Sequence, residues 1–274
     1  MHMTVQKHFD LTCAQAACLA LSQEMELDDT VWALGEDLGP EGGVAGQYLG
    51  LQERFGKQRI LDTPISESQI AAAAIGSALA GTRPVAELRY ADFAYCATDE
   101  IVNQAAKIRY MLGGQVKVPV VCRQSIGIRS GMAAQHSQSN EALWVSTPGL
   151  VVLAPSNPAD YHAMLKAAIR SDDPVMFLEH KELWTLRGPV NPETSPGTIG
   201  KARWMTSGKD LTLVSWSSSV HTCLKAAELL VHYGLSADVI DLCSLWPWDR
   251  EMVEESLHRT GRLLVVHEST QTNG

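Results

Sequence analysis

The fold of this chain is decided by residues 61–81, LDTPISESQIAAAAIGSALAG. This stretch reads as the end of a strand, a proline turn and a helix made of small apolar residues. Ser66 is the expected N-cap, with Gln69 as its partner in a capping box, and Gly81 is the expected residue after the C-cap. Because the helix is apolar on all sides, we expect it to be buried. Glu67 would then be a carboxylate at the tip of a buried helix.

Short apolar strands alternate with helices along the rest of the chain. This alternation predicts an α/β fold with a parallel sheet that helices cover on both faces. In the first part of the chain we expect strands at residues 31–34, 59–61, 85–88, 118–122, 150–154 and 175–178. We expect helices at residues 12–27, 49–55, 67–80, 92–112 and 158–170. Thr12 and Gln15 form a second expected capping box, at the start of the first helix.

A segment rich in Pro and Gly, RGPVNPETSPGTIG, predicts a linker at residues 187–200. It separates a first domain, residues 1–186, from a second domain, residues 201–274. The second domain restarts the alternation, with strands at 211–215, 237–241 and 263–266 and helices at 219–233 and 249–257. Three strands and two helices are few for an α/β domain. We therefore expect a smaller, incomplete and truncated C-terminal domain.

The overall charge and composition exclude several classes of protein. Lys and Arg number 22 and Asp and Glu number 31, which gives a net charge of −9 and argues against nucleic acid or an anionic membrane as the main partner. The apolar runs are too short to span a bilayer, and the first ten residues contain no apolar core of a signal peptide. We expect a protein of the bacterial cytoplasm or of an organelle matrix. The six cysteines lack CxxC spacing and are expected to be buried free thiols.

Several standard sites are absent from the sequence. There is no GxGxxG after the first strand, and no GxxxxGK[ST], HExxH or GxSxG motif. The Gly-Asp-Gly sequence that can begin a metal–diphosphate site is also missing. A chain of this class that binds a nucleotide-like ligand would therefore need another source for its phosphate-binding loop.

Four features could carry chemistry. They are Glu67, His136 in a small-residue turn, Phe93 at a strand-to-helix junction, and the acidic pair Glu36–Asp37 at a strand end. Each has a structural explanation when taken alone. An acid at the start of a helix, for example, gains about 0.3–1 kcal/mol from the helix dipole.

Together the features resemble one family, the beta subunits of the thiamine-diphosphate-dependent 2-oxo acid dehydrogenases for pyruvate and branched-chain substrates, and of the related acetoin dehydrogenases, within the transketolase-like superfamily. The resemblance covers essentially the whole chain. Its blocks are GED at 35–37, ILDTPISE at 60–67, IVNQAAKIRYMLGGQ at 101–115, AAQHSQS at 133–139, PGLVVLAPSNPAD at 148–160 and LKAAIRSDDPVMFLEHK at 165–181. In that family the Gly-Asp-Gly motif, which binds the diphosphate and Mg²⁺, lies on the alpha subunit. The resemblance therefore implies that this chain is the pyrimidine-binding half of a shared site.

The resemblance also assigns roles to the candidate residues. Glu67 matches the glutamate that bonds the far nitrogen of the pyrimidine ring and drives its shift to the imino form. Such acid–base help is typically worth ~10²–10⁴ in rate. Phe93 matches an aromatic residue that lies against the pyrimidine. His136 matches a histidine on the substrate side, which acts on intermediates or in acyl transfer to a lipoyl group.

Two further sets of residues follow from the resemblance. Glu36, with Asp99 or Glu100, corresponds to an acidic chain that links the two active sites in relatives. Main-chain carbonyls that hold a monovalent cation such as K⁺ in relatives correspond to Val120, Ala168, Ile169, Ser171 and Asp173. Ser171 stands where an Asp is common in the family.

The leading hypothesis is the beta subunit of the decarboxylating component of a 2-oxo acid dehydrogenase complex, active only with its alpha subunit. Two alpha and two beta chains, a lipoyl-bearing acyltransferase core and a small 2-oxo acid are the expected partners. The close alternative is the beta subunit of an acetoin dehydrogenase. Residues 124–133, QSIGIRSGMA, replace a GPGGG-like loop of many relatives, so the substrate does not transfer. The alternative of another class is a non-catalytic assembly subunit.

Overall fold

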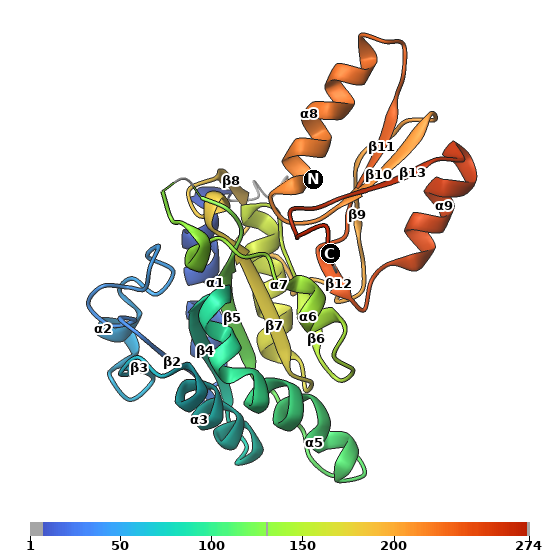
Figure 1. Ribbon diagram of the computed structural model, residues 1–274. Coiled ribbons are helices and arrows are strands. Elements are labelled where there is room, and N and C mark those ends of the chain that lie inside the picture. The colour runs from blue at the N-terminus through green and yellow to red at the C-terminus, as the bar shows by residue number, and fades with distance from the viewer. Residues whose placement is uncertain (1–7, 130, 273–274) are drawn as a thin grey trace, which may run out of the picture.

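A seven-stranded sheet forms the centre of the first unit in the computed structural model, which describes residues 8–129 and 131–272 (Figure 1). Its strand order is β12-β6-β7-β5-β4-β2-β3. The bounds are β2 Val31–Gly35, β3 Ile60–Asp62, β4 Arg83–Tyr90, β5 Val121–Ile126, β6 Val151–Leu153, β7 Val175–His180 and β12 Ser244–Trp246. Every pair in this sheet is parallel except the pairing of β12 with β6. The predicted parallel sheet is therefore confirmed.

Helices cover both faces of this sheet. One face packs against α1 (Cys13–Leu27) and α7 (Pro158–Arg170). The other packs against α3 (Glu67–Leu79), α4 (Ala91–Ala94), α5 (Ala106–Met111) and α6 (Glu141–Val145). Successive strand residues point to opposite faces, so Val85 joins the first core while Ala86 joins the second. A glycine-rich loop, residues 36–50, connects β2 to a short helix, α2 (Leu51–Phe55).

The second unit is a four-stranded sheet between two helices (Figure 1). Its order is β13-β10-β11-β9, with bounds β9 Arg203–Thr206, β10 Leu211–Ser215, β11 Ala237–Asp241 and β13 Leu263–Val266. Leu213 packs toward α8 (Ser219–Val231), and Val214 packs toward α9 (Arg250–Thr260). β9 pairs antiparallel with β11, a strand that the sequence pattern did not predict.

Two connections tie the units together. The predicted linker at 187–200 begins with a strand, β8 (Arg187–Val190), which pairs antiparallel with β1 (Phe9–Thr12). β12, which comes from the second unit in sequence, adds to the edge of the first sheet beside β6. The two units therefore share a sheet. The domain boundaries at 186 and 201 stay a prediction.

Some local predictions were confirmed and others were wrong. The capping box at α1 forms, since the Gln15 amide donates to Thr12 Oγ1 at 3.1 Å and the Thr12 amide donates to Gln15 Oε1 at 3.0 Å. The capping box at α3 does not, because Ser66 has φ −169° and ψ 87° and its side chain makes no cap hydrogen bond. Gly81, at φ +100°, ends α3 as expected.

Two predictions about burial were also wrong. α3 is apolar all round but is not buried all round, because Ala72, Ala73 and Gly76 are exposed on one side. Not all cysteines are buried: all six are free thiols, yet Cys96 is exposed and Cys18 is half-buried.

The predicted helix at 92–112 is divided into α4, a 3₁₀ turn η1 (Tyr95–Ala97), a π-helix η2 (Asp99–Ala105) and α5. No helix in the described residues is long and apolar enough to cross a membrane.

The two caps make a matched test of helix stability. Thr12→Ala should lower the free energy of unfolding by about 1 kcal/mol, because the Gln15 amide loses its capping acceptor, Thr12 Oγ1. Ser66→Ala should change it by less than about 0.5 kcal/mol, since no cap bond is lost. Chemical denaturation of the three proteins measures both values. Equal losses in the two variants would contradict this account of the caps.

Candidate active site

Four predicted site residues come from loops at one edge of the first sheet. β3, β2, β4 and β5 are neighbours and run parallel, so their carboxyl ends meet at the same edge. Glu36 follows β2, Glu67 follows β3, Phe93 follows β4 and His136 follows β5. This edge is where open α/β sheets bind ligands.

Glu67 is the first residue of α3 and is 7% exposed. Within the described part of the chain, its carboxylate makes no hydrogen bond or ion pair with another side chain. The amino terminus of a helix favours a negative charge at this place. Glu67 is therefore a largely buried residue whose carboxylate has no partner among the described side chains.

Phe93 and His136 lie in one aromatic cluster with Tyr90. The His136 ring centroid is 5.3 Å from that of Phe93, at an interplanar angle of 89°, and 4.5 Å from that of Tyr90. Tyr90 and Phe93 are 5.9 Å apart in an edge-to-face arrangement. The imidazole is thus held by two aromatic rings, and two of the predicted residues are brought together.

Glu36 lies close enough to Glu67 for the two charges to interact. Burial raises the pKa of Glu36, the Arg89 guanidinium lowers it, and the charges of Glu67 and Asp37 raise it. Arg89 Nε is 3.3 Å from Glu36 Oε2. The structure therefore places a predicted relay carboxylate beside the predicted catalytic one.

Asp99 and Glu100 are not joined to this pair. Asp99 accepts a hydrogen bond from Asn103 Nδ2 at 2.7 Å, one turn along η2. Glu100 has one buried carboxylate oxygen without a hydrogen-bond partner in the described residues. Their part in a proton relay stays a prediction.

The carbonyls predicted to hold a monovalent cation already accept bonds from the protein. Arg83 Nη1 donates to the carbonyls of Ile169 and Ser171, at 3.1 and 2.9 Å. The Val175 amide donates to the Val120 carbonyl, and the Ser171 amide donates to the Ala168 carbonyl. The Ser171 hydroxyl donates to the Asp173 carbonyl. A guanidinium therefore stands beside two of the five carbonyls. Each carbonyl oxygen has two lone pairs, so the monovalent-cation site at these five residues stays a prediction.

Two charged residues that the sequence analysis missed lie at the same edge. Arg89 is in β4, and Lys181 follows β7 directly. Lys181 is 1% exposed, and its ammonium lies 5.5 Å from the Tyr90 ring centroid. Burial lowers the pKa of Lys181 to about 8, and the charges of Asp92 and Glu268 oppose that change. No pattern in the sequence singled out either residue: Lys181 follows Glu179 and His180, and Arg89 follows a single apolar residue, Leu88.

A buried charge cluster lies beneath the site and joins three strands. Arg123 on β5 donates from Nε and Nη2 to the two oxygens of Glu179 on β7, at 2.8 and 2.9 Å. Glu87 on β4 lies 4.0 Å from Arg123 Nε and accepts from the Tyr48 hydroxyl at 3.0 Å. All four side chains are at most 2% exposed. The cluster therefore fixes β4, β5 and β7 relative to the glycine-rich loop that carries Tyr48.

Comparison with known proteins places this site in a family. Residues 10–185 match the transketolase pyrimidine binding domain, and residues 200–274 match the transketolase C-terminal domain. The chain is 42% identical to the 2-oxoisovalerate dehydrogenase subunit beta of Bacillus subtilis, over 98% of this chain and 81% of that one. The chain belongs to the transketolase-like family of 2-oxo acid dehydrogenase beta subunits.

Other members of the family carry different names. The beta subunit of the acetoin:2,6-dichlorophenolindophenol oxidoreductase of Cupriavidus necator is 44% identical, over 92% of this chain and 77% of that one. The mitochondrial pyruvate dehydrogenase E1 component subunit beta-1 of Arabidopsis thaliana is 41% identical, over 97% and 74%.

Solved structures agree on the fold. A split-gene transketolase, described as an inactive beta4 tetramer, superposes with a TM-score of 0.79 at 23% identity, covering 95% of this chain and 81% of that one. A Pichia stipitis transketolase gives a TM-score of 0.73 at 16% identity, covering 96% and 40%. The likeness shows the fold alone.

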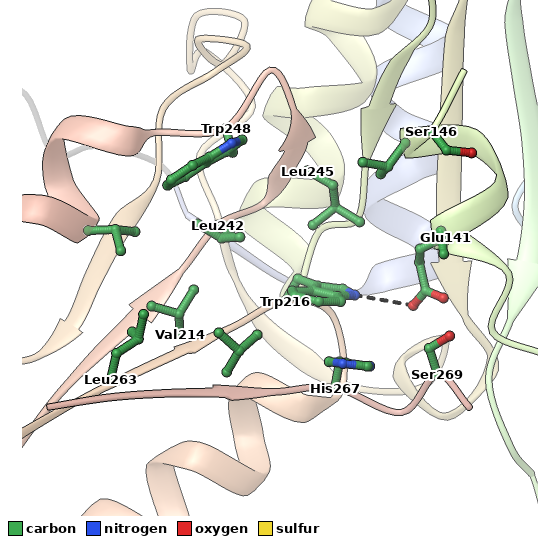
Figure 2. Close-up of a pocket in the computed structure, with 14 residues that line it drawn as sticks. Glu141, Ser146, Val214, Trp216, Leu242, Leu245, Trp248, Leu263, His267 and Ser269 are labelled. Atoms are coloured by element: carbon green, nitrogen blue, oxygen red, sulfur yellow. Dashed lines mark hydrogen bonds between the residues drawn. The ribbon is translucent and has the colours of Figure 1, made fainter. Parts of the chain in front are cut away.

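A large cavity of this beta subunit lies away from the predicted site (Figure 2). It has a volume of about 500 Å³ and lies between α6 and the second unit. Trp216 stacks on His267 with ring centroids 5.2 Å apart and donates from Nε1 to Glu141 Oε1 at 3.1 Å. Neither Glu67 nor His136 lines it. In the residues that the structure describes, no group of three or more His, Cys, Asp or Glu side chains could hold a metal.

The buried charge cluster makes a pH-dependent prediction. Arg123→Met should lower the free energy of unfolding by about 3–5 kcal/mol near pH 8, because two carboxylates would be buried without their cation. Burial raises the pKa of Glu87 to about 7 already in the native chain, against a lowering by Arg123. A carboxyl group whose pKa is raised by folding favours the native state only while it is protonated. The loss should therefore shrink as the pH falls from 8 to 5.

The control for this prediction is Arg250→Met, which breaks an exposed ion pair with Glu254. Such a pair is worth about 0.3–0.5 kcal/mol, so this variant should remain close to the parent at every pH. Urea unfolding at several pH values measures both variants. A pH-independent loss in Arg123→Met, or one as small as the control, would contradict the role of the cluster.

Proposed function

We propose that this chain is the pyrimidine-binding half of a thiamine-diphosphate enzyme that decarboxylates a 2-oxo acid and passes the acyl group to a lipoyl group. One observation carries the proposal: a shielded, unpaired carboxylate at Glu67 lies at the same sheet edge as Phe93 and His136. The family membership supports the reaction class. The absence of a Gly-Asp-Gly motif from the sequence supports a site shared with an alpha subunit.

The residues of this chain fit one end of the cofactor. When bound, thiamine diphosphate supplies the carbanion chemistry that decarboxylation requires. Glu67 would hold the proton at the far pyrimidine nitrogen, and Phe93 would pack against the pyrimidine ring. His136 would give or take a proton on the substrate side, a role that an imidazole commonly fills. The diphosphate and Mg²⁺ would be held by the alpha subunit.

An alpha chain needs an apolar surface on which to dock. α3 offers one beside the site, where small residues lie exposed next to Ile65, which is 79% exposed. Exposed large apolar side chains that form a patch mark interaction surfaces. We propose two alpha and two beta chains in the bacterial cytoplasm or an organelle matrix, docked on a lipoyl-bearing acyltransferase core.

The acetoin dehydrogenase is the second candidate function. The Cupriavidus necator relative is as similar to this chain as the 2-oxo acid relatives are. The described residues 127–129 and 131–133 follow β5 and lead to the turn that carries His136. Assays of the complex with pyruvate, a branched 2-oxo acid and acetoin separate the two. Dye reduction with acetoin alone would favour the acetoin enzyme. No reduction with any of the three would favour an assembly subunit.

The Glu67 assignment predicts a large loss of activity. In the complex with its alpha chain, Glu67→Gln should lower thiamine-diphosphate-dependent turnover by about 10²–10⁴, the usual value of general acid–base help. The control is Glu53→Gln, which changes an exposed acid in the first turn of α2 and should leave turnover unchanged. Turnover in Glu67→Gln equal to that of the parent would refute the assignment.

The His136 assignment predicts a split between two acceptors. His136→Asn should lower acyl transfer to a lipoyl domain more than it lowers reduction of an artificial dye, because only the first reaction needs a proton donor on the substrate side. Gln138→Asn changes an exposed residue of the same loop and should lower neither by much. Equal losses with both acceptors in His136→Asn would contradict a role in acyl transfer.

A further inference from the structure

Arg89 occupies a backbone conformation that is costly for a long side chain. Its φ is +57°, in the left-handed region, where a residue other than Gly costs of order 1–3 kcal/mol and persists only when its surroundings require it. The β4–β5 register shifts between Glu87 and Tyr90, so the strand bends at this residue. Arg89 stands directly before Tyr90, the residue that contacts His136.

Glu87 holds this bend. Its Oε1 accepts a hydrogen bond from the Arg89 amide at 3.0 Å, and its Oε2 accepts from the Tyr48 hydroxyl at 3.0 Å. A Cβ on Gly35 would lie 2.8 Å from Glu87 Cβ, so the neighbouring strand packs directly against this side chain. Glu87 is 1% exposed and belongs to the cluster around Arg123. Its carboxylate is therefore fixed on several sides.

The bend directs the Arg89 guanidinium onto two acids of the glycine-rich loop. Nε lies 3.3 Å from Glu36 Oε2, and Nη2 donates to Asp37 Oδ2 at 2.5 Å. Asp37 also has a positive φ, of +55°. Two strained backbone positions are thus joined by one ion pair, next to the candidate catalytic carboxylate.

The charge state of Glu36 depends on this arrangement. Burial raises its pKa, and so do the charges of Glu67 on α3 and Asp37 on its own loop. Arg89 on β4 supplies the positive charge that opposes these effects. Only an ionised Glu36 can accept a proton that Glu67 releases, so a relay through Glu36 depends on the guanidinium.

We propose that Arg89 keeps Glu36 ionised beside Glu67, and that Glu87 is the positioning residue that holds Arg89 in place. The inference rests on the proposed function, because it gives Glu36 its use. It goes beyond that function in assigning the electrostatic control of the relay to two residues that do not touch the cofactor.

The direct test is the titration of Glu36. The full chain, alone and in complex with alpha, is labelled with ¹³C at its glutamate carboxyl groups, and the Glu36 signal is assigned by comparison with Glu36→Gln. In Arg89→Gln the Glu36 midpoint should move to higher pH, because an opposite charge close to the carboxylate is lost. Arg109→Gln, which removes the guanidinium that pairs with Asp173 on another part of the domain, should leave it in place. An unchanged midpoint in Arg89→Gln would overturn the proposal.

A second test separates an electrostatic role from a structural one. In the complex, the acid limb of the kcat/KM profile should move to higher pH in Arg89→Gln and return toward the parent in Arg89→Lys. A rate lowered equally at every pH would show a structural role only and would overturn the proposal. If the complex turns over no substrate at all, the proposed function fails, while the carboxyl titration still decides the role of Arg89.

Glu87→Ala tests the positioning step. The Arg89 amide would lose its acceptor, so Arg89 should leave Glu36 and the Glu36 midpoint should move in the same direction as in Arg89→Gln. A folded Glu87→Ala protein with the parent midpoint would refute the role of Glu87. If this variant does not fold, Glu87→Gln replaces it, because Gln keeps an acceptor oxygen for the Arg89 amide. The Glu36 midpoint in Glu87→Gln should equal that of the parent. A displaced midpoint would count against positioning by that oxygen.

Discussion

The buried contact between Arg123 and Glu179 is the constraint on which the candidate site depends. Two carboxylates and one guanidinium, all without access to water, are tolerated only because the geometry is bidentate and further bonds satisfy the oxygens. The strands that carry them, β4, β5 and β7, are neighbours in the sheet. Their carboxyl ends deliver Tyr90, the loop of His136, and Lys181. The site is therefore positioned by charge pairing beneath it as well as by apolar packing.

The sequence predicted the parts of the fold that local rules govern. Apolar periodicity located the parallel strands, and the Thr12 cap formed because Thr12 itself has an extended backbone, with φ −74° and ψ 162°. Ser66 is also a hydroxyl residue with Gln three positions on, but its ψ of 87° departs from the extended backbone of Thr12, and its side chain makes no cap hydrogen bond. β12 was missed because three residues gain strand geometry only from their partner β6 in the other unit.

The site was predicted in part for the same reason. Glu67, Phe93 and His136 follow strands that the sequence predicted, so the predicted topology could place all three at one edge of the sheet. Arg89 and Lys181 could not be chosen, because their importance comes from a strand bend and from burial that are set by distant residues. The cation carbonyls come from the family pattern alone, and the sequence did not predict that Arg83 Nη1 donates to two of them.

The central claim is that this chain forms only half of a thiamine-diphosphate site. Calorimetric titration of thiamine diphosphate with Mg²⁺ into this chain, into the alpha chain encoded in the same genome, and into their mixture tests it most directly. The account predicts that tight binding requires the mixture. Binding to this chain alone with the affinity of the mixture, or a mixture that forms a stable complex and binds no cofactor, would contradict it.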